Sequence, residues 1–268
     1  MVAEIGGRRF EWGSRVYVMG IVNVTPDSFS GDGLLDPDAA VAQGLRMVAE
    51  GADILDVGGE STRPGHLPVP AQEEIARVLP VLRGLSQMAG VPVSIDTSKL
   101  EVAKAALEAG ATIVNDVWGL QRSPGIADSA ASHGAALVLM HNQEGTHYEG
   151  DLVQELTASL ARSLAQSLHR GVPRERVILD PGIGFGKTAE QNLVVLRRLG
   201  ELRRLGQPIL VGTSRKSFLG KLFGQGPGER LEGTAASLTA AILQGADIVR
   251  VHDVKEMTRV ARVAEALR

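Results

Sequence analysis

The stretch Gln244-Gly245-Ala246-Asp247-Ile248-Val249-Arg250-Val251, QGADIVRV, decides the fold. A turn of small residues with a glycine leads directly into a short apolar run. This pattern is typical of a helix C-terminus that is followed by a buried strand. Similar turns precede apolar runs at 50–53, 108–111 and 133–135, which indicates a repeated helix-turn-strand unit.

Short apolar runs recur along the whole chain, with stretches of helical periodicity between them. The strand candidates are 16–22, 54–57, 91–95, 112–114, 136–140, 177–179, 208–211 and 247–251. The helix candidates include 37–50, 71–88, 99–108, 152–170, 189–205 and 234–244. Regular alternation of the two predicts a parallel sheet that is covered on both faces.

The number of units and the chain length favour a closed barrel. Eight strand-helix units in 268 residues match a (β/α)8 TIM barrel better than an open doubly wound sheet, which stays the alternative. No linker rich in Pro, Gly or Ser divides the chain, so a single domain over 1–268 is expected. The first dozen residues are expected to form a hairpin or plug before the first barrel strand.

Composition excludes several classes of protein. A net charge of −3 without a basic run argues against nucleic-acid binding, and the pairs Arg197-Arg198 and Arg203-Arg204 fit an exposed helix face. The absence of cysteine excludes disulfides and thiolate metal sites and fits a reducing compartment. No apolar run suggests a secretory signal or a membrane span, so a cytoplasmic protein is expected.

Polar residues follow nearly every strand candidate, where the active site of a parallel barrel lies. They are Asn23, Asp56, Asp96, Asn115, His141, Asp180, Thr213, Ser214, Arg215 and Lys216. Arg250 and His252 are two positions apart, so they are expected to converge from one strand. Asp53, Asp116 and Asp253 are interpreted as helix caps or turn formers.

These residues form two chemical groups. Asp96, Asn115 and Asp180 offer hydrogen-bond acceptors and an amide, which suits a flat heterocycle with several N–H donors. A second set, Asn23, Arg63, Arg250 and His252, offers donors to an anion, beneath the loops 25–33 and 58–65. Together they predict a substrate with a donor-rich ring and a phosphate that departs from it. No nucleophilic triad or cysteine indicates a covalent enzyme intermediate.

The segment 180–188, DPGIGFGKT, resembles a nucleotide-binding loop but does not fulfil its requirements. Pro181 occupies the position of the first glycine of a phosphate loop and has no N–H to donate. The third glycine of a dinucleotide fingerprint would fall on Lys187. Asp180 is therefore the expected working residue of the segment, and Lys187 is expected to matter least.

Eight ordered segments carry a family resemblance. They are MGIVNVTPDSFSGDG at 19–33, ILDVGGESTRPG at 54–65, SIDTSK at 94–99, IVNDVWG at 113–119, LDPGIGFGKT at 179–188, LVGTSRKSFLG at 210–220, LEGTAAS at 231–237 and ADIVRVHDV at 246–254. In this order they resemble the dihydropteroate synthase family over nearly the whole chain. The resemblance implies a pterin-binding barrel that joins 6-hydroxymethyl-7,8-dihydropterin diphosphate to p-aminobenzoate for folate synthesis, with release of pyrophosphate.

The resemblance also implies roles for individual residues. The pterin would be held by Asp96, Asn115, Val117, Met140, Asp180, Gly212 and Lys216, and the diphosphate by Asn23, Arg63, Arg250 and His252. Asn23 would ligate Mg²⁺. The p-aminobenzoate site, where sulfonamides compete, would be bordered by Phe29, Thr62, Arg63, Pro64, Phe185, Ser214 and Lys216. The residues closest to the chemistry would be Asp96, Asp180, Lys216, Arg250 and His252.

Two segments depart from the family pattern. Asp32 is displaced by one position in the loop Ser30-Gly31-Asp32-Gly33-Leu34, which leaves its role open. For His141, a bond to neighbouring backbone is expected at least as strongly as contact with substrate. The alternatives are a pterin-binding methyltransferase of the methyltetrahydrofolate and corrinoid type, and a catalytically silent paralogue. The family suggests a homodimer through the late helices.

Overall fold

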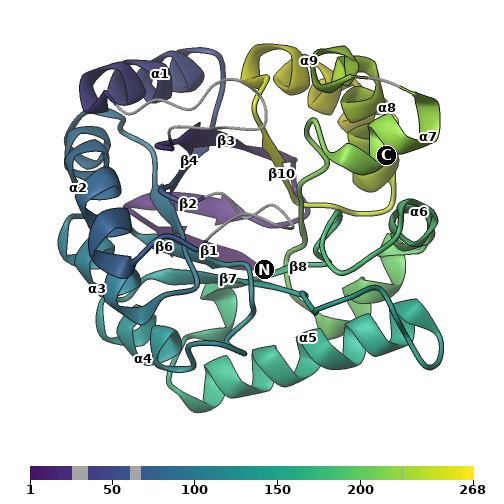
Figure 1. Cartoon of the computed structure of the whole chain (residues 1–268), viewed down its shortest axis with the longest axis horizontal. Coiled ribbons are helices and arrows are strands. Elements are labelled where there is room, and N and C mark those ends of the chain that lie inside the picture. Colours follow the sequence, from purple (N-terminus) through teal and green to yellow (C-terminus); the bar gives the residue numbers. More distant parts are fainter. Residues whose placement is uncertain (26–35, 61–67, 225) are drawn as a thin grey trace.

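A computed structural model describes residues 1–25, 36–60, 68–224 and 226–268 of the chain. Within these residues eight parallel strands form one sheet, with helices around it (Figure 1). The strands are β3 (Tyr17–Asn23), β4 (Ile54–Gly58), β5 (Val93–Asp96), β6 (Ile113–Asp116), β7 (Ala136–Met140), β8 (Val177–Asp180), β9 (Leu210–Val211) and β10 (Ile248–Val251). Each of them overlaps one of the predicted strands.

The sheet closes into a barrel. Its strand order is β8-β7-β6-β5-β4-β3-β10-β9, and the two outer members meet through a parallel bridge between Leu179 and Ile209. The N–H of Leu179 also donates to the carbonyl of Pro208 at 3.0 Å. The closed (β/α)8 barrel is therefore confirmed over the open sheet.

Helices surround the barrel and connect its strands. They are α1 (Pro37–Ala49), α2 (Ala71–Met88), α3 (Leu100–Glu108), α4 (Gly125–Ser132), α5 (Leu152–His169), α6 (Ala189–Arg197), α7 (Ser217–Phe223), α8 (Leu231–Leu243) and α9 (Val254–Ala266). At the four predicted turns the glycine has positive φ, for example 110° at Gly51 and 99° at Gly245.

One predicted helix is interrupted. The stretch 189–205 ends as an α-helix at Arg197 and continues as the 3₁₀ helix η2 (Leu199–Leu205). Arg198, between the two parts, is held by Asp151 and Glu201 at 2.6 Å each. These ion pairs fix its side chain where the helix changes type. The shorter 3₁₀ helices η1 (Arg174–Arg176) and η3 (Pro227–Glu229) precede β8 and α8.

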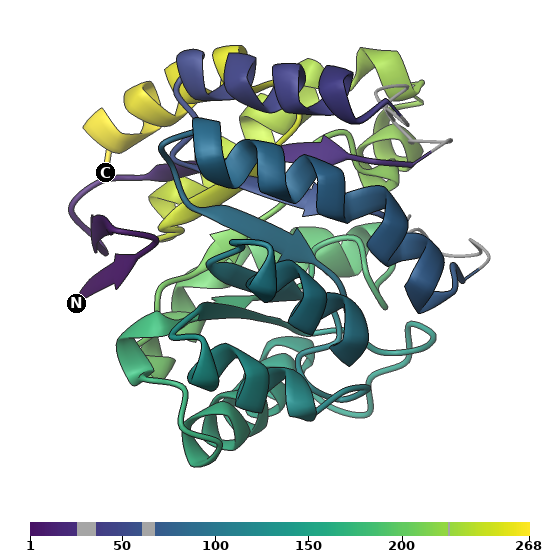
Figure 2. The same cartoon turned by 90° about the vertical axis from the view of Figure 1, so that its left-hand side faces the viewer.

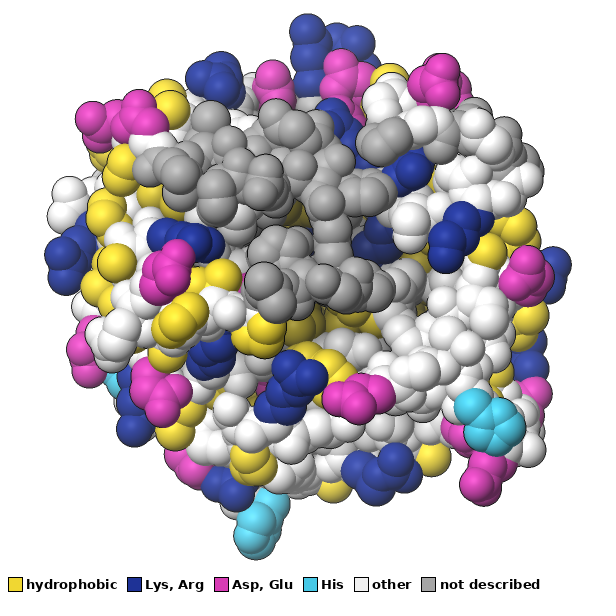
Figure 3. Space-filling view, in the orientation of Figure 1, with side chains coloured by type: hydrophobic (Ala, Val, Ile, Leu, Met, Phe, Trp, Pro, Cys, Tyr) yellow, Lys and Arg dark blue, Asp and Glu magenta, His cyan; other side chains and the backbone are white. Residues whose placement is uncertain are grey.

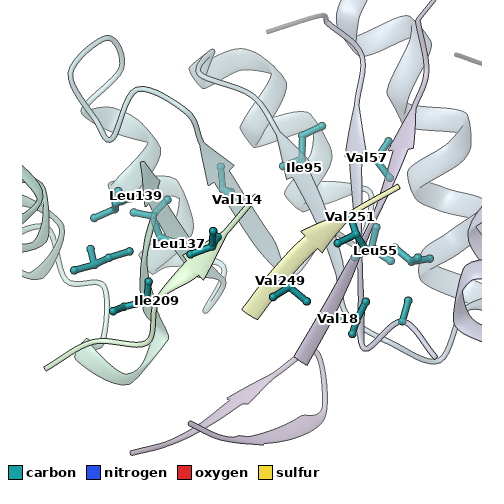
Figure 4. Packing of buried hydrophobic residues seen from close by; sticks show 14 of the residues in the cluster. Val18, Leu55, Val57, Ile95, Val114, Leu137, Leu139, Ile209, Val249 and Val251 are labelled. Atoms are coloured by element: carbon teal, nitrogen blue, oxygen red, sulfur yellow. The ribbon is translucent and has the colours of Figure 1, made fainter. Parts of the chain in front are cut away.

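Alternation along the strands divides the core into two parts. Outward side chains such as Val18, Leu55 and Val249 belong to the large cluster that packs against the helices (Figure 4). Inward side chains form a second cluster inside the barrel, made of Tyr17, Met19, Ile54, Ile113, Ala136, Val138, Ile178, Leu210 and Ile248 together with the N-terminal residues Ala3, Ile5, Phe10 and Trp12. The barrel interior is therefore packed and apolar at the end where the strands begin.

An antiparallel hairpin covers that end of the barrel, as predicted. It consists of β1 (Val2–Ile5) and β2 (Arg8–Glu11). Phe10 lies 1% exposed, with its ring 4.9 Å from that of Tyr17 and 5.2 Å from that of Trp12. Figure 2 shows the hairpin at one end of the barrel, away from the end toward which the strand arrows point.

Candidate active site

The polar residues lie inside the barrel, one layer above the apolar interior. Ile54, Ile113, Ile178 and Ile248 belong to the interior cluster. Residues two positions later on a strand face the same side, and these are Asp56, Asn115, Asp180 and Arg250. Asp96, Met140 and Gly212 stand at the ends of the other strands. The expected ring of strand-end residues is therefore brought together, and Figure 3 shows this hollowed face with Lys and Arg side chains beside the hollow.

A buried ion-pair network connects four members of the ring. Arg250 donates from Nε to Asp56 Oδ2 and from Nη2 to Asp96 Oδ2, each at 2.6 Å. Asn115 Nδ2 donates to the same Oδ2 of Asp56 at 2.9 Å. Asp56 is 0% exposed and Asp96 is 7% exposed. One guanidinium thus fixes two carboxylates, and through Asp56 it also fixes the amide.

Each of the same two carboxylates has an oxygen atom that could accept a hydrogen bond from a ligand. The Oδ1 atoms of Asp56 and Asp96 are buried and have no hydrogen-bond partner among the described residues. Burial raises the pKa of Asp96 to about 7, although Arg250 acts in the opposite direction. A group with this pKa accepts hydrogen bonds from N–H donors and can hold a proton near neutral pH. The floor of the site is thus suited to a ring that presents several N–H groups.

Asp180 and Lys216 form the next part of the site. Asp180 Oδ1 accepts from the N–H of Gly182 at 2.7 Å, and burial raises its pKa. The ammonium of Lys216 donates to the carbonyl of Ile183 and lies 4.4 Å from the ring centroid of Phe185. Burial lowers the pKa of Lys216 to about 8, against the attraction of Asp180. The half-buried Phe185 therefore lies beside the lysine with which it was grouped from the sequence.

Arg250 and His252 have different partners. Arg250 contacts the two carboxylates, whereas His252 Nδ1 lies 2.9 Å from Ser214 Oγ. The backbone N–H of His252 also donates to that hydroxyl, at 3.1 Å. Arg215 forms an ion pair with Asp253, so its guanidinium is held at the rim by a carboxylate.

The remaining predicted ligands of the ring substrate lie around the same opening. Val117 and Met140 are buried at the ends of β6 and β7 and offer apolar surface. Gly212 follows β9 and lies against the stem of Arg250, where a Cβ would make an ordinary contact at 3.6 Å. Asn23 ends β3 and is half-buried. Phe29, Asp32, Thr62, Arg63 and Pro64 lie outside the described residues.

Three aspartates interpreted as caps or turn formers have different roles. Asp116 accepts from the N–H groups of Trp118 at 2.9 Å and Leu120 at 2.6 Å, which confirms a turn former. Asp253 does stand at the N-cap position of α9, as predicted, although its side chain makes no capping bond and pairs with Arg215. The side chain of Asp53 instead pairs with Arg15 at 2.6 Å and accepts from the N–H of Val18 at 2.9 Å.

The sequence missed two features. Asp56 was noted after a strand but was not included in the site, since a single buried carboxylate gives no sign of its partner 194 residues away. Lys187, expected to matter least, is 8% exposed and lies 3.1 Å from His141 Nδ1. A side chain, and not only neighbouring backbone, thus holds His141. The sequence signal that could have indicated the buried Lys187 was the presence of a lysine inside a glycine-rich loop.

Comparison with known proteins shows the family of the chain. The model of the family described as pterin binding enzyme matches residues 19–252. A dihydropteroate synthase of Synechocystis sp. is 49% identical over 272 residues, covering 98% of this chain and 94% of that protein.

Solved structures give the same result. A dihydropteroate synthase from Clostridium difficile in the presence of pteroic acid has a TM-score of 0.92 and 49% identity, covering 96% of this chain and 98% of that chain. One from Xanthomonas albilineans with 4-aminobenzoic acid has a TM-score of 0.92 and 41% identity, covering 99% and 97%. With matches over nearly its full length, this chain belongs to the pterin binding enzyme family, among the dihydropteroate synthases.

Proposed function

We propose that the protein is a dihydropteroate synthase, a transferase of folate biosynthesis. It condenses 6-hydroxymethyl-7,8-dihydropterin diphosphate with p-aminobenzoate to 7,8-dihydropteroate and pyrophosphate. The observation that carries this proposal is the buried floor of Asp56, Asp96 and Asn115 held by Arg250, with Asp180 and Lys216 beside it. Such a floor matches the edge of a pterin, which carries several ring and amino N–H donors.

The floor has a direct role in the reaction. The bond between the pterin methylene and the diphosphate oxygen breaks, and the electron pair leaves with the pyrophosphate. The positive charge that develops on the pterin lies next to the carboxylates of Asp96 and Asp180, which are fixed before the reaction and stabilise it. The uncharged arylamine then attacks the methylene and loses its proton, so a strong general base is unnecessary.

The leaving diphosphate requires positive charge and hydrogen-bond donors at the rim of the barrel. Arg250 and His252 lie at the end of β10, and we propose that they hold this anion with Arg63. Arg250 already has two carboxylate partners, so the diphosphate would share its guanidinium with Asp56 and Asp96. The energetic gain from that contact comes as negative charge accumulates on the departing oxygen.

We propose that Mg²⁺ accompanies the diphosphate, with Asn23 as a protein ligand. Among the described residues no group of three or more His, Cys, Asp or Glu could hold a metal. Mg²⁺ keeps several waters and takes one or two protein oxygens plus substrate phosphates, so a single amide oxygen at the rim fits this ion. When bound, it would supply Lewis-acid stabilisation of the leaving group.

The second substrate would lie beside Phe185 and Lys216. The ring of Phe185 is half-buried at the opening, and the lysine ammonium beside it offers a charge to a benzoate carboxylate. Ser214, which was also grouped with this site, is 4% exposed and is engaged by His252. Ser214 would therefore influence the second substrate through His252, and it would contact that substrate directly only after its bond to His252 is broken.

The two alternatives find less support. A methyltransferase of the corrinoid type needs no anion-binding rim, whereas here Arg250 and His252 stand together at the end of β10 and Lys216 lies beside Phe185. A silent paralogue is expected to lack some of the pterin-facing groups. Asp96, Asn115, Asp180 and Lys216 are all present and brought together. The dihydropteroate synthase reaction is therefore the function that the geometry supports best.

Purified protein should release pyrophosphate and form dihydropteroate when given the pterin diphosphate, p-aminobenzoate and Mg²⁺. Slow release of pyrophosphate from the pterin diphosphate alone would fit the proposed order of bond breaking. Protein that binds the pterin diphosphate with Mg²⁺ but forms no dihydropteroate would overturn the proposal and favour the silent paralogue.

We also propose a homodimer through the late helices. Helices α8 and α9 pack against each other. Large apolar side chains are exposed along them, with Leu243 46%, Val263 63% and Leu267 68% accessible. Exposed apolar side chains on two helices that pack together support a surface covered by a partner.

We place the enzyme in the cytoplasm. Its cysteine-free sequence carries no disulfide suited to an oxidising compartment. Among the described helices, none has the length and apolarity that crossing a membrane requires.

A further inference from the structure

The turn that carries Phe185 is held from both sides by lysines. Phe185 donates its N–H to the carbonyl of Gly182 at 3.1 Å, which closes a four-residue turn after β8. Lys216 contacts this turn at the carbonyl of Ile183 and over the ring of Phe185. Lys187 contacts it from within, and nothing in the proposed reaction uses Lys187.

Lys187 binds both ends of the turn. Its Nζ donates to the carbonyl of Gly182 and to the carbonyl of Phe185, each at 3.0 Å. Gly182 is the residue whose N–H also holds Asp180 Oδ1. The lysine is 8% exposed, and a lysine is buried this deeply only when its donors are satisfied. Its three contacts meet that condition.

The third contact connects the turn to the loop after β7. Lys187 Nζ lies 3.1 Å from Nδ1 of the buried His141. The ring of Tyr148 stacks on His141 with centroids 6.1 Å apart, and the Tyr148 hydroxyl donates to the carbonyl of Gly186 at 3.0 Å. The wall beside Phe185 is thus tied to the loop after β7 by side chains that do not reach the floor of the site.

These bonds can persist when Lys187 loses a proton. Burial lowers the pKa of Lys187 to about 7, with Asp180 opposing and Lys216 adding to the shift. As an ammonium, Lys187 donates to the two carbonyls and to His141 Nδ1. As an amine, it donates to the carbonyls and accepts from Nδ1–H after a change of histidine tautomer. All three partners are satisfied in both states.

We infer that Lys187 is a positioning residue that holds Phe185 in place for the second substrate, acting through the Gly182–Phe185 turn and supported by His141 and Tyr148. The inference rests on the proposed function for the identity of that substrate. It assigns the lysine of the glycine-rich loop a role in the binding of p-aminobenzoate, without contact between Lys187 and either substrate.

The inference is tested with Lys187→Met, which keeps the length of the side chain and removes its donors. Loss of the bonds to the two carbonyls frees the turn, so KM for p-aminobenzoate should rise about tenfold. The kcat at saturating p-aminobenzoate should fall less than about threefold, because the pterin floor is intact. Binding of the pterin diphosphate with Mg²⁺, measured by calorimetry, should be within about threefold of wild type.

Two further variants complete the test. Lys104→Met changes an exposed lysine of α3 and should leave every constant unchanged. Tyr148→Phe removes only the hydroxyl that contacts Gly186, and a smaller rise in KM for p-aminobenzoate is expected. If Lys187→Met does not fold, the KM of Tyr148→Phe for p-aminobenzoate tests the inference.

The outcomes separate the inference from the proposed function. Wild-type protein without dihydropteroate synthesis overturns the function itself. The inference alone is overturned if wild type is active and folded Lys187→Met has an unchanged KM for p-aminobenzoate. If Lys187→Met does not fold, an unchanged KM in Tyr148→Phe has the same meaning. The inference is also overturned if affinity for the pterin diphosphate falls by the same factor as KM for p-aminobenzoate rises, since that result indicates a general structural role.

Discussion

Asp56 and Arg250 lie 194 residues apart in the sequence, and the carboxylate Oδ2 of one is 2.6 Å from the guanidinium Nε of the other. The pair joins β4 to β10 across the interior of the barrel. Because Arg250 also contacts Asp96, and Asp56 also contacts Asn115, this ion pair sets the geometry of the pterin floor. The proposed reaction thus depends on a carboxylate that is completely buried.

Asp56→Asn should destabilise the protein and weaken the site. The change keeps the size of the side chain but leaves the buried Arg250 with one counter-charge, so the free energy of unfolding should fall by about 3 kcal/mol. Urea denaturation measures the loss, and calorimetry should show weaker binding of the pterin diphosphate. Asp53→Asn breaks an ion pair with Arg15 at the opposite end of the barrel and should leave pterin binding unchanged. Equal pterin affinity in both variants would contradict the role of Asp56.

Asp180→Asn should weaken pterin binding while the fold is retained. The carboxylate is buried and accepts one bond from Gly182, so an amide can replace its acceptor but not its charge. We expect the affinity for the pterin diphosphate to fall roughly 100-fold, the effect of losing a charged hydrogen bond. Calorimetry tests this, with circular dichroism to verify the fold. A folded variant with wild-type affinity would exclude Asp180 from the pterin site.

Lys216→Ala should impair the use of both substrates. Its ammonium contacts the turn at Ile183, lies over Phe185 and is close enough to Asp180 for the charges to interact. We expect kcat/KM to fall about 100-fold for the pterin diphosphate and for p-aminobenzoate. Lys187→Ala should cause a smaller loss, because Lys187 acts only through the turn. Steady-state kinetics measures kcat/KM for both variants. A larger fall in Lys187→Ala than in Lys216→Ala would reverse the assignment of the two lysines.

His141 should make the protein sensitive to acid. Burial lowers its pKa to about 3, with Lys187 adding to the shift. The unfolded chain binds a proton below about pH 6.5 and the folded chain does not, so this contribution to stability is present above that pH and is lost on acidification toward pH 3.

Comparison with a neutral side chain isolates this effect. From about pH 7.5 to about pH 5, wild type should lose about 2 kcal/mol more unfolding free energy than His141→Asn. His147→Asn alters an exposed histidine of the same loop and should show the wild-type slope. Identical slopes for wild type and His141→Asn, measured by urea denaturation, would show that His141 does not remain neutral.

Val263→Glu should dissociate the proposed homodimer. The side chain is 63% exposed on α9, and a carboxylate there would have to be desolvated in an apolar interface. Sedimentation velocity should show a monomer, whereas Lys255→Glu on the same helix should remain dimeric. A Val263→Glu protein that sediments as a dimer would exclude this surface as the interface.

The strands and their polar ends could be predicted because both depend on local sequence. A buried parallel strand needs a continuous apolar run, and the residues that follow it reach the mouth of any barrel. The positions of Asp96, Asn115 and Asp180 at the ends of their strands were predicted in this way. Helix α9 could also have been found, since its buried residues Val254, Met257, Ala261 and Ala264 follow helical spacing.

The features that were missed depend on contacts between distant segments. The periodicity of 189–205 continues past Arg198, but ion pairs with Asp151 and Glu201 hold that residue where the α-helix ends. Arg215 follows a strand, where substrate ligands are expected, but its guanidinium forms an ion pair with Asp253. Lys187 is buried by bonds to the nearby carbonyls of Gly182 and Phe185 and by its contact with the distant His141. In each case at least one partner is distant in sequence, so its identity requires the fold.

The N-terminal hairpin has a consequence for the order of events. Phe10 and Trp12 pack into the interior cluster, so among the described residues the end of the barrel where the strands begin is filled with apolar side chains. Asp96 stands at the other end of its strand, and Phe185 and Lys216 lie in the segments that follow β8 and β9. Asp96 and Asp180 are buried, whereas Phe185 is half-buried. On the proposed function we therefore expect the pterin diphosphate to bind before p-aminobenzoate, since its proposed site lies deeper in the barrel.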